Sequence, residues 1–128
     1  MKPERESDIQ KTILQYLTTI LGWMMWRSNS GGMKVEERYV QFNTAKGCSD
    51  LLGVIPISTK PEFSPAFSRG RFLAIEVKRS GKKPTALQQA YLDQVRDAGG
   101  LALVATSIDD LRKQLREAGY DVPSTPHT

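Results

Sequence analysis

Apolar positions recur along this chain with two different spacings, and each spacing predicts a different kind of element. Between residues 9 and 21 the aliphatic side chains follow helical spacing, and Ser7 to Gln10 fit a capping box, so a helix is expected from about Ser7 to Gly22. The stripe consists of Ile9, Ile13, Leu14, Leu17, Ile20 and Leu21. One amphipathic helix therefore occupies the beginning of the chain.

Two further helices are expected in the second half. Residues 85–88 form another capping box, and Gly99 and Gly100 mark the end of the helix that it opens. The apolar face predicted for this helix consists of Leu87, Tyr91, Val95 and Ala98. The last helix is expected over residues 107–118, with three aliphatic side chains facing inward.

Short apolar runs predict the strands. Residues 23–27, 51–55 and 101–105 are expected to be buried strands, residues 71–78 alternate like a strand with one polar face, and residues 34–43 are a less regular extended segment. Prolines and serines in residues 56–70 predict a loop. A helix between the third and fourth main strands makes those strands parallel neighbours. The fold class is α/β, a mixed central sheet flanked by helices.

The bulk composition excludes several classes of protein. With 128 residues, 39% hydrophobic and 25% charged, the chain fits one soluble domain, expected over residues 1–121 and followed by a disordered tail over residues 122–128. No apolar run approaches the roughly 20 residues that cross a bilayer, and no secretory h-region is visible, so a cytoplasmic location is expected. A single Cys48 and a single His127 exclude an internal disulfide and a Cys/His zinc site.

The positive charge of the chain is concentrated in one segment. Residues 69–83 contain six Lys or Arg and one acid, so the net charge of this segment is +5. The remaining residues together carry −1, which gives the chain its net charge of +4. A local basic patch suits a polyanionic ligand such as nucleic acid. A solvated basic loop is the structural alternative.

Within this basic segment lies the most informative group of residues. Glu76 and Lys78 are two apart on a strand and share one face, and Asp50 stands at the start of another strand. Mg²⁺ prefers oxygen ligands, and one or two carboxylates with substrate phosphates are sufficient to bind it. A lysine beside them can orient a water molecule and keep Glu76 ionised. A structural ion pair between neighbouring strands is the alternative interpretation.

At this point the sequence resembles a known family. Over residues 6–111 the chain resembles the VRR-NUC domain of the PD-(D/E)XK nuclease superfamily. The resemblance rests on motifs in this order: an acid on the first helix, Gly-x-Ser-Asp, Ile-Glu-Val-Lys, Thr-x-x-Gln and Gly-Gly. The catalytic residues implied by this resemblance are Asp50, Glu76, Lys78, Gln88 and Glu6, and the metal ligands are Asp50, Glu76, Val77 and Glu6. Ser49 stands where the superfamily name has proline, and residues 56–70 look like an insertion.

The resemblance implies a restriction-endonuclease-like fold and a Mg²⁺- or Mn²⁺-dependent DNA endonuclease. Small stand-alone members of the family resemble homodimers that act on branched DNA such as Holliday junctions. Two other classes stay open: a catalytically inactive nucleic-acid-binding module and a purely structural subunit. Gln88 has a second explanation as the capping partner of Thr85, and Glu4 is a rival to Glu6.

Several other residues are expected to contact DNA or to pack. The predicted phosphate contacts are Arg27, Asn29, Lys46, Arg79, Lys82 and Lys83, with surface solvation as the competing explanation for the first three. The bulky residues 23–26 favour a core or subunit interface over base stacking. Cys48 is expected to be a small buried residue because no activating histidine lies nearby.

Overall fold

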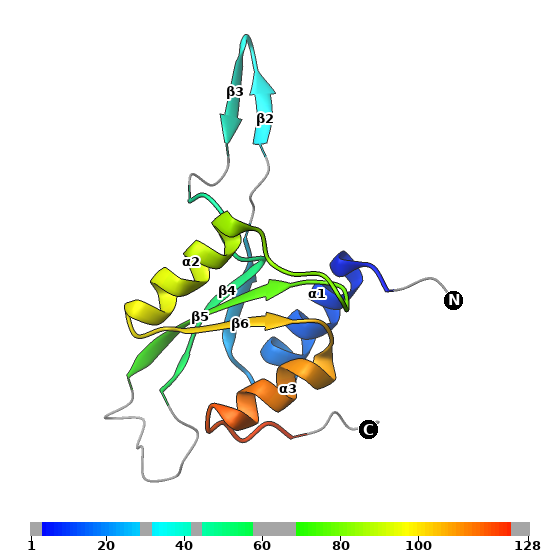
Figure 1. Cartoon of the computed structure of the whole chain (residues 1–128), viewed down its shortest axis with the longest axis vertical. Coiled ribbons are helices and arrows are strands. Elements are labelled where there is room, and N and C mark those ends of the chain that lie inside the picture. Colours follow the sequence, from blue (N-terminus) through cyan, green and yellow to red (C-terminus); the bar gives the residue numbers. More distant parts are fainter. Residues whose placement is uncertain (1–3, 29–31, 42–44, 58–68, 124–128) are drawn as a thin grey trace.

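A four-stranded mixed sheet forms the centre of the computed structural model, which describes residues 4–28, 32–41, 45–57 and 69–123 (Figure 1). The strand order is β1-β4-β5-β6, with β1 Met24–Arg27, β4 Leu51–Pro56, β5 Gly70–Val77 and β6 Leu101–Ala105. β1 and β5 pair with β4 in antiparallel fashion, and β6 pairs with β5 in parallel. The predicted α/β class with a mixed central sheet is confirmed, as is the parallel crossover.

Helices cover both faces of this sheet. α1 Glu6–Gln15 and α3 Ile108–Glu117 lie on one face, and α2 Ala86–Asp97 lies on the other (Figure 1). A π-helical turn, η1 Tyr16–Ile20, continues α1 to Gly22, whose positive φ of 69° suits a glycine. The sequence pattern predicts the helical stripe but does not distinguish the π turn from a regular α-helical one.

The central strand β5 is buried on both of its faces. Leu73, Ile75 and Val77 belong to the main core with α1 and α3, whereas Ala74 packs with Leu92 under α2. The alternation of a strand therefore places residues 72, 74, 76 and 78 toward the α2 face of the sheet. By the same alternation residues 50, 52 and 54 of the β4 segment share that face, because Leu51 and Ile55 lie in the main core.

A separate hairpin stands apart from the sheet. β2 Gly32–Val35 and β3 Arg38–Gln41 pair with each other and project from the body of the molecule (Figure 1). Glu36 and Glu37 form the turn, and Glu36 adopts a positive φ of 58°. The prediction of one extended segment over residues 34–43 is wrong, because the chain reverses at Glu36 and Glu37. This turn contains none of the glycine or proline residues that usually mark a turn in a sequence.

One predicted helix start differs from the structure. α1 begins at Glu6, with Arg5 as its N-cap and no side-chain cap, so Ser7 lies inside the helix and caps nothing. By contrast, the predicted capping box of Thr85 and Gln88 is formed, and Ser107, the first residue of the last predicted helix, is the N-cap of α3. Only two of the three Ser or Thr starts therefore act as caps.

Burial corrects three other expectations. Leu92 is the buried residue of α2, and Leu87 is 58% exposed, because the apolar face of this helix is rotated from the predicted one. β1 is an edge strand and leaves Met24 and Trp26 exposed. Val122 is buried in the main core, so the domain extends past residue 121, and only residues 124–128 of the predicted tail lie outside the described residues. In the part of the chain that the structure describes, no helix is long and apolar enough to cross a membrane.

Candidate metal and phosphate site

Asp50 and Glu76 lie across from one another on the α2 face of the sheet. The β4–β5 register pairs Leu51 with Ile75, so the next position in the ladder places Asp50, which immediately precedes β4, opposite Glu76. Two like charges directly opposite each other on antiparallel strands destabilise a sheet. This pair therefore needs either a shared proton or a cation between its carboxyl groups.

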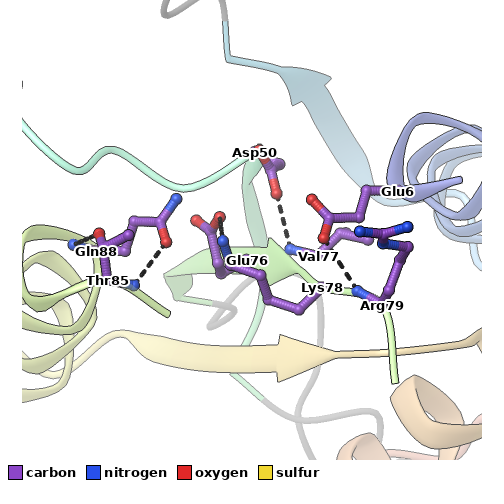
Figure 2. Close-up of polar contacts among 8 residues, drawn as sticks. All are labelled: Glu6, Asp50, Glu76, Val77, Lys78, Arg79, Thr85 and Gln88. Carbon is purple, nitrogen blue, oxygen red and sulfur yellow. Dashed lines mark hydrogen bonds and ion pairs between the residues drawn. The ribbon is translucent and has the colours of Figure 1, made fainter. Parts of the chain in front are cut away.

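The backbone fixes Asp50 from two sides. The Ser28 N–H donates to the Asp50 carbonyl at 2.8 Å, and the Val77 N–H donates to Asp50 Oδ2 at 2.8 Å (Figure 2). Just upstream, Gly47 has φ 70°, and a Cβ there would lie 2.2 Å from the Leu87 carbonyl oxygen of α2. Only glycine allows this turn to pass so close to the start of α2 and then deliver Asp50 to the sheet.

Glu76 is the buried member of the pair. Its relative exposure is 2%, and its Oε2 has no hydrogen-bond donor among the described residues. Lys78 approaches from the same face of the strand, with Nζ 4.0 Å from Glu76 Oε1 and a side chain that is 14% exposed (Figure 2). The lysine thus points toward the carboxyl pair and not into the hydrophobic core. A buried acid with an open oxygen is a costly arrangement unless a cation occupies that position.

Burial raises the pKa of both carboxyl groups, and the charge of Asp50 raises that of Glu76 further. Burial first, and then the charge of Asp50, raises the pKa of Glu76 to about 8, although Lys78 acts in the opposite direction. Burial also raises the pKa of Asp50 above its ordinary value, against the hydrogen bond from Val77 and the charge of Lys78. Asp50 offers Glu76 a hydrogen bond only when one of the two groups holds a proton. A divalent cation would replace that proton.

Glu6 lies at the margin of this site. It is the first residue of α1, its Oε2 accepts the Arg79 N–H at 3.1 Å, and its charge contributes to the raised pKa values of both Asp50 and Glu76 (Figure 2). In the described ranges no three Asp, Glu, His or Cys side chains come close enough to hold a metal by themselves. A metal site here would thus have two close carboxylates, those of Asp50 and Glu76, and Glu6 lies outside this pair. Glu4, the alternative to Glu6, is exposed.

Val77 and Gln88 have clear structural places. The aliphatic side chain of Val77 is in the core, so only its backbone can act at the site, and its N–H already serves Asp50. Gln88 Oε1 accepts the Thr85 N–H at 2.9 Å in the capping box. This contact holds Gln88 at the start of α2, on the same side of the sheet as Glu76 (Figure 2).

The predicted phosphate contacts fall into three groups. Lys82 and Lys83 are exposed in the connection from β5 to α2, and Lys46 is exposed in the turn before Asp50. Arg27 donates to Gln10 Oε1 at 3.0 and 3.2 Å; the alternation of β1 places it on the face of α1, opposite to the acids. Arg27 therefore lies on the face opposite to the acid pair, and its contact with phosphate stays a prediction. Asn29 lies outside the described residues.

Sequence reasoning missed two neighbours of the site, Arg5 and Ser28. Arg5 and Arg79 line a small cavity of about 220 Å³ with Glu6, which adds Arg5 to the basic groups at this end of α1. Ser28 fixes the Asp50 backbone, and its Oγ lies 3.3 Å from Cys48 Sγ. Cys48 is half-buried. The pKa of Tyr91 is raised to about 12, first by the burial of Tyr91 itself and then by its hydrogen bond with Cys48. Arg5 could have been predicted because it directly precedes Glu6 in the sequence. Ser28 could not, because it acts through its backbone N–H, which every residue except proline has.

The fold and site together define a restriction-endonuclease-like α/β domain with an acid–acid–lysine group at the end of its central strands. Solved structures include four matching chains, and one of them, described as a VRR_NUC domain protein, superposes with a TM-score of 0.56 at 18% identity. The match covers 97% of this chain and 98% of the other. No family model matches the sequence, and no curated protein matches it significantly. The predicted VRR-NUC resemblance is confirmed at the level of the fold.

Proposed function

We propose that this protein is a Mg²⁺- or Mn²⁺-dependent DNA endonuclease of the VRR-NUC type that hydrolyses phosphodiester bonds in branched DNA such as Holliday junctions. One observation carries the proposal: a buried glutamate with an open oxygen lies opposite a second carboxyl group and 4.0 Å from a lysine. Structural ion pairs do not need a second acid at this position. A cation-binding site can use both carboxylates as ligands.

Asp50 and Glu76 would hold the cation through their carboxylate oxygens, an arrangement that suits Mg²⁺ because this ion retains several waters and takes one or two carboxylates. The donor set is all oxygen, as hard cations require. When bound, the ion lowers the pKa of a water molecule and offsets negative charge on the phosphoryl oxygens. The hydrogen bond from Val77 to Asp50 keeps this carboxyl group in place before the ion arrives.

Lys78 supplies the second electrostatic element. Its ammonium group is mostly buried and lies beside Glu76, so it can donate a hydrogen bond to the attacking water or to a phosphate oxygen as negative charge develops. Lys82, Lys83 and Lys46 are exposed near the same end of the sheet and would contact the DNA backbone. Gln88 and Glu6 would support the site from α2 and α1.

A homodimer belongs to the same proposal. Each chain carries one acid–acid–lysine group, and cutting both strands of a junction in concert requires two such sites related by symmetry.

The test is cleavage of labelled DNA. The protein is incubated with a four-way junction, a flap and plain duplex, each with Mn²⁺ and with EDTA, beside Glu76→Ala and Lys78→Ala variants. The proposal requires cleavage that depends on metal and is lost in both variants. A Glu117→Gln variant, which changes an exposed acid at the end of α3, is the control that should retain activity. Binding without cleavage would instead indicate a nucleic-acid-binding module, and no affinity for DNA would refute both.

A further inference from the structure

Helix α2 leaves half of its sheet face uncovered. It packs over β5 and β6 and its apolar cluster reaches Leu52 of β4, whereas the same face of β1 and of β4 around Val54 carries no helix in the described chain. Three exposed apolar side chains lie on this open part and a fourth lies beside it at the beginning of β5; we call the four the aromatic face: Met24 (67% exposed), Trp26 (40%), Val54 (43%) and Phe72 (36%). Contiguous exposed apolar groups on a small protein indicate an interaction site.

Strand register makes the aromatic face continuous. Met24 pairs with Val54 and Val54 pairs with Phe72, so three of its members form one row across β1, β4 and β5. Trp26 pairs with Leu52, one step closer to the acid pair. At a strand spacing of about 4.8 Å the row is about 10 Å wide.

A groove extends this face toward α2. A cavity of about 730 Å³ lies between the beginning of β5 and the C-terminal half of α2, and Phe72, Tyr91 and Val95 are among its lining residues. Arg69 and Arg71 line it as well, and its lining within the described residues includes no acid. Arg71 Nε donates to the Gly99 carbonyl at 3.1 Å, which anchors the side chain at the rim. The groove combines aromatic surface with positive charge.

The aromatic face and the acid pair share one side of the sheet. Phe72 precedes Glu76 by four residues on β5, which corresponds to about 13 Å along a strand. Asp50 and Val54 are related in the same way on the neighbouring strand. A DNA strand whose phosphate lies at the acid pair can therefore continue directly over Trp26 and Phe72.

We propose that the aromatic face binds a single-stranded segment of the DNA substrate, with bases stacked on Trp26 and Phe72 and phosphates held by Arg69 and Arg71. This inference rests on the proposed nuclease function and assigns its substrate class: DNA with an unpaired strand next to the scissile bond. Exposed aromatic side chains beside arginines are the usual platform for unpaired bases. A second copy of the chain fits less well, because the groove rim has two arginines and offers them no acid.

Tryptophan fluorescence tests this directly. The chain has two tryptophans; Trp23 is 7% exposed and packs against Tyr120 with ring centroids 5.3 Å apart, so Trp26 is the accessible reporter. Oligo(dT) is added to a Glu76→Gln protein in EDTA, which prevents cleavage without touching the aromatic face. Emission should be quenched, and a Trp26→Phe variant should lose the quenching. Phe72→Ala should bind oligo(dT) at least about fivefold more weakly by anisotropy.

Val35→Ala is the matched control, because Val35 is an apolar strand residue of similar exposure (44%) on the separate hairpin. It should leave the affinity unchanged. Absence of quenching, or equal affinity in Phe72→Ala and Val35→Ala, would overturn the inference. So would a dimer in size-exclusion chromatography with light scattering that Phe72→Ala dissociates, since the face would then be covered by a second copy. Quenching without any cleavage by the wild type would support DNA binding on the aromatic face and refute the nuclease function. Cleavage of duplex DNA without quenching would support the nuclease function and refute DNA binding on the aromatic face.

Discussion

Raising the pH is expected to destabilise the metal-free protein because of a single buried carboxyl group. The pKa of Glu76 is about 8 in the folded state and 4.5 in an ordinary environment. Between these two values the unfolded chain has lost the proton while the folded protein keeps it, so folding is favoured by low pH. The stabilisation is complete below pH 4.5 and is lost as the pH rises through about 8. Asp50, whose pKa is also raised, acts in the same direction.

The size of the effect follows from the shift. Each retained proton changes the free energy of unfolding by about 1.4 kcal/mol per pH unit, so the Glu76 contribution falls by about 3 kcal/mol between pH 5 and pH 7.5. For a small domain this is a large fraction of the total stability. Replacing the acid with a neutral isostere, Glu76→Gln, should remove that slope and make the metal-free variant more stable than wild type near pH 8.

Urea unfolding followed by circular dichroism at half-unit pH steps, in EDTA, measures this difference. Glu117→Gln, at the exposed end of α3, is the matched control and should retain the wild-type profile. The comparison of variant with wild type reports Glu76 together with the part of the Asp50 titration that depends on it, because all other ionisable residues are common to both proteins. Parallel profiles for wild type and Glu76→Gln across pH 5–8 would refute the reasoning that Glu76 is protonated in the metal-free fold.

Three further predictions concern the lysines and the start of α2. Lys78→Met should slow cleavage at least about 100-fold while Mn²⁺ binding persists, and an unchanged single-turnover rate would remove the lysine from the mechanism. Lys82→Ala combined with Lys83→Ala should weaken DNA binding and reduce the slope of log K against log salt by about 1.8, measured by anisotropy at several salt concentrations; an equal slope would exclude both phosphate contacts. Thr85→Ala should lower the free energy of unfolding by about 1 kcal/mol in urea titrations because the capping box is formed, and a neutral result would show that the cap is dispensable.

Much of the fold could be predicted because local pattern and burial agree. β5 and β6 read as apolar runs, and both are buried: β5 lies in the centre of the sheet, and β6, although at the edge, is covered by α2 and α3. The Thr85 and Ser107 caps are local signals that depend on three or four residues, and both are formed. β1 differs because tertiary context decides its exposure: residues 23–27 look like a buried strand, but the segment lies at the edge of the sheet, where no helix covers the Trp26 face.

The predicted constellation of the site depended on the same alternation. Placing Glu76 and Lys78 on one face follows from strand geometry, and the structure brings Asp50 opposite Glu76. The role of Ser28 could not be predicted, because it rests on a backbone N–H and on a sheet register that the sequence does not encode locally. The face that Arg27 occupies could not be predicted for a related reason: its position near Asp50 in the fold does not decide the face until the strand is placed.

Binding of Mn²⁺ to the carboxyl pair is the central claim, and a calorimetric titration at pH 7 in two buffers of different ionisation enthalpy tests it most directly. Glu76, with a pKa of about 8, is mostly protonated at this pH, so the wild-type protein should bind Mn²⁺ and release close to one proton for each ion bound. Glu76→Gln should bind more weakly and release none. Equal affinity and equal proton release in the two proteins, or no binding to the wild type, would contradict the claim that Asp50 and Glu76 form a metal site.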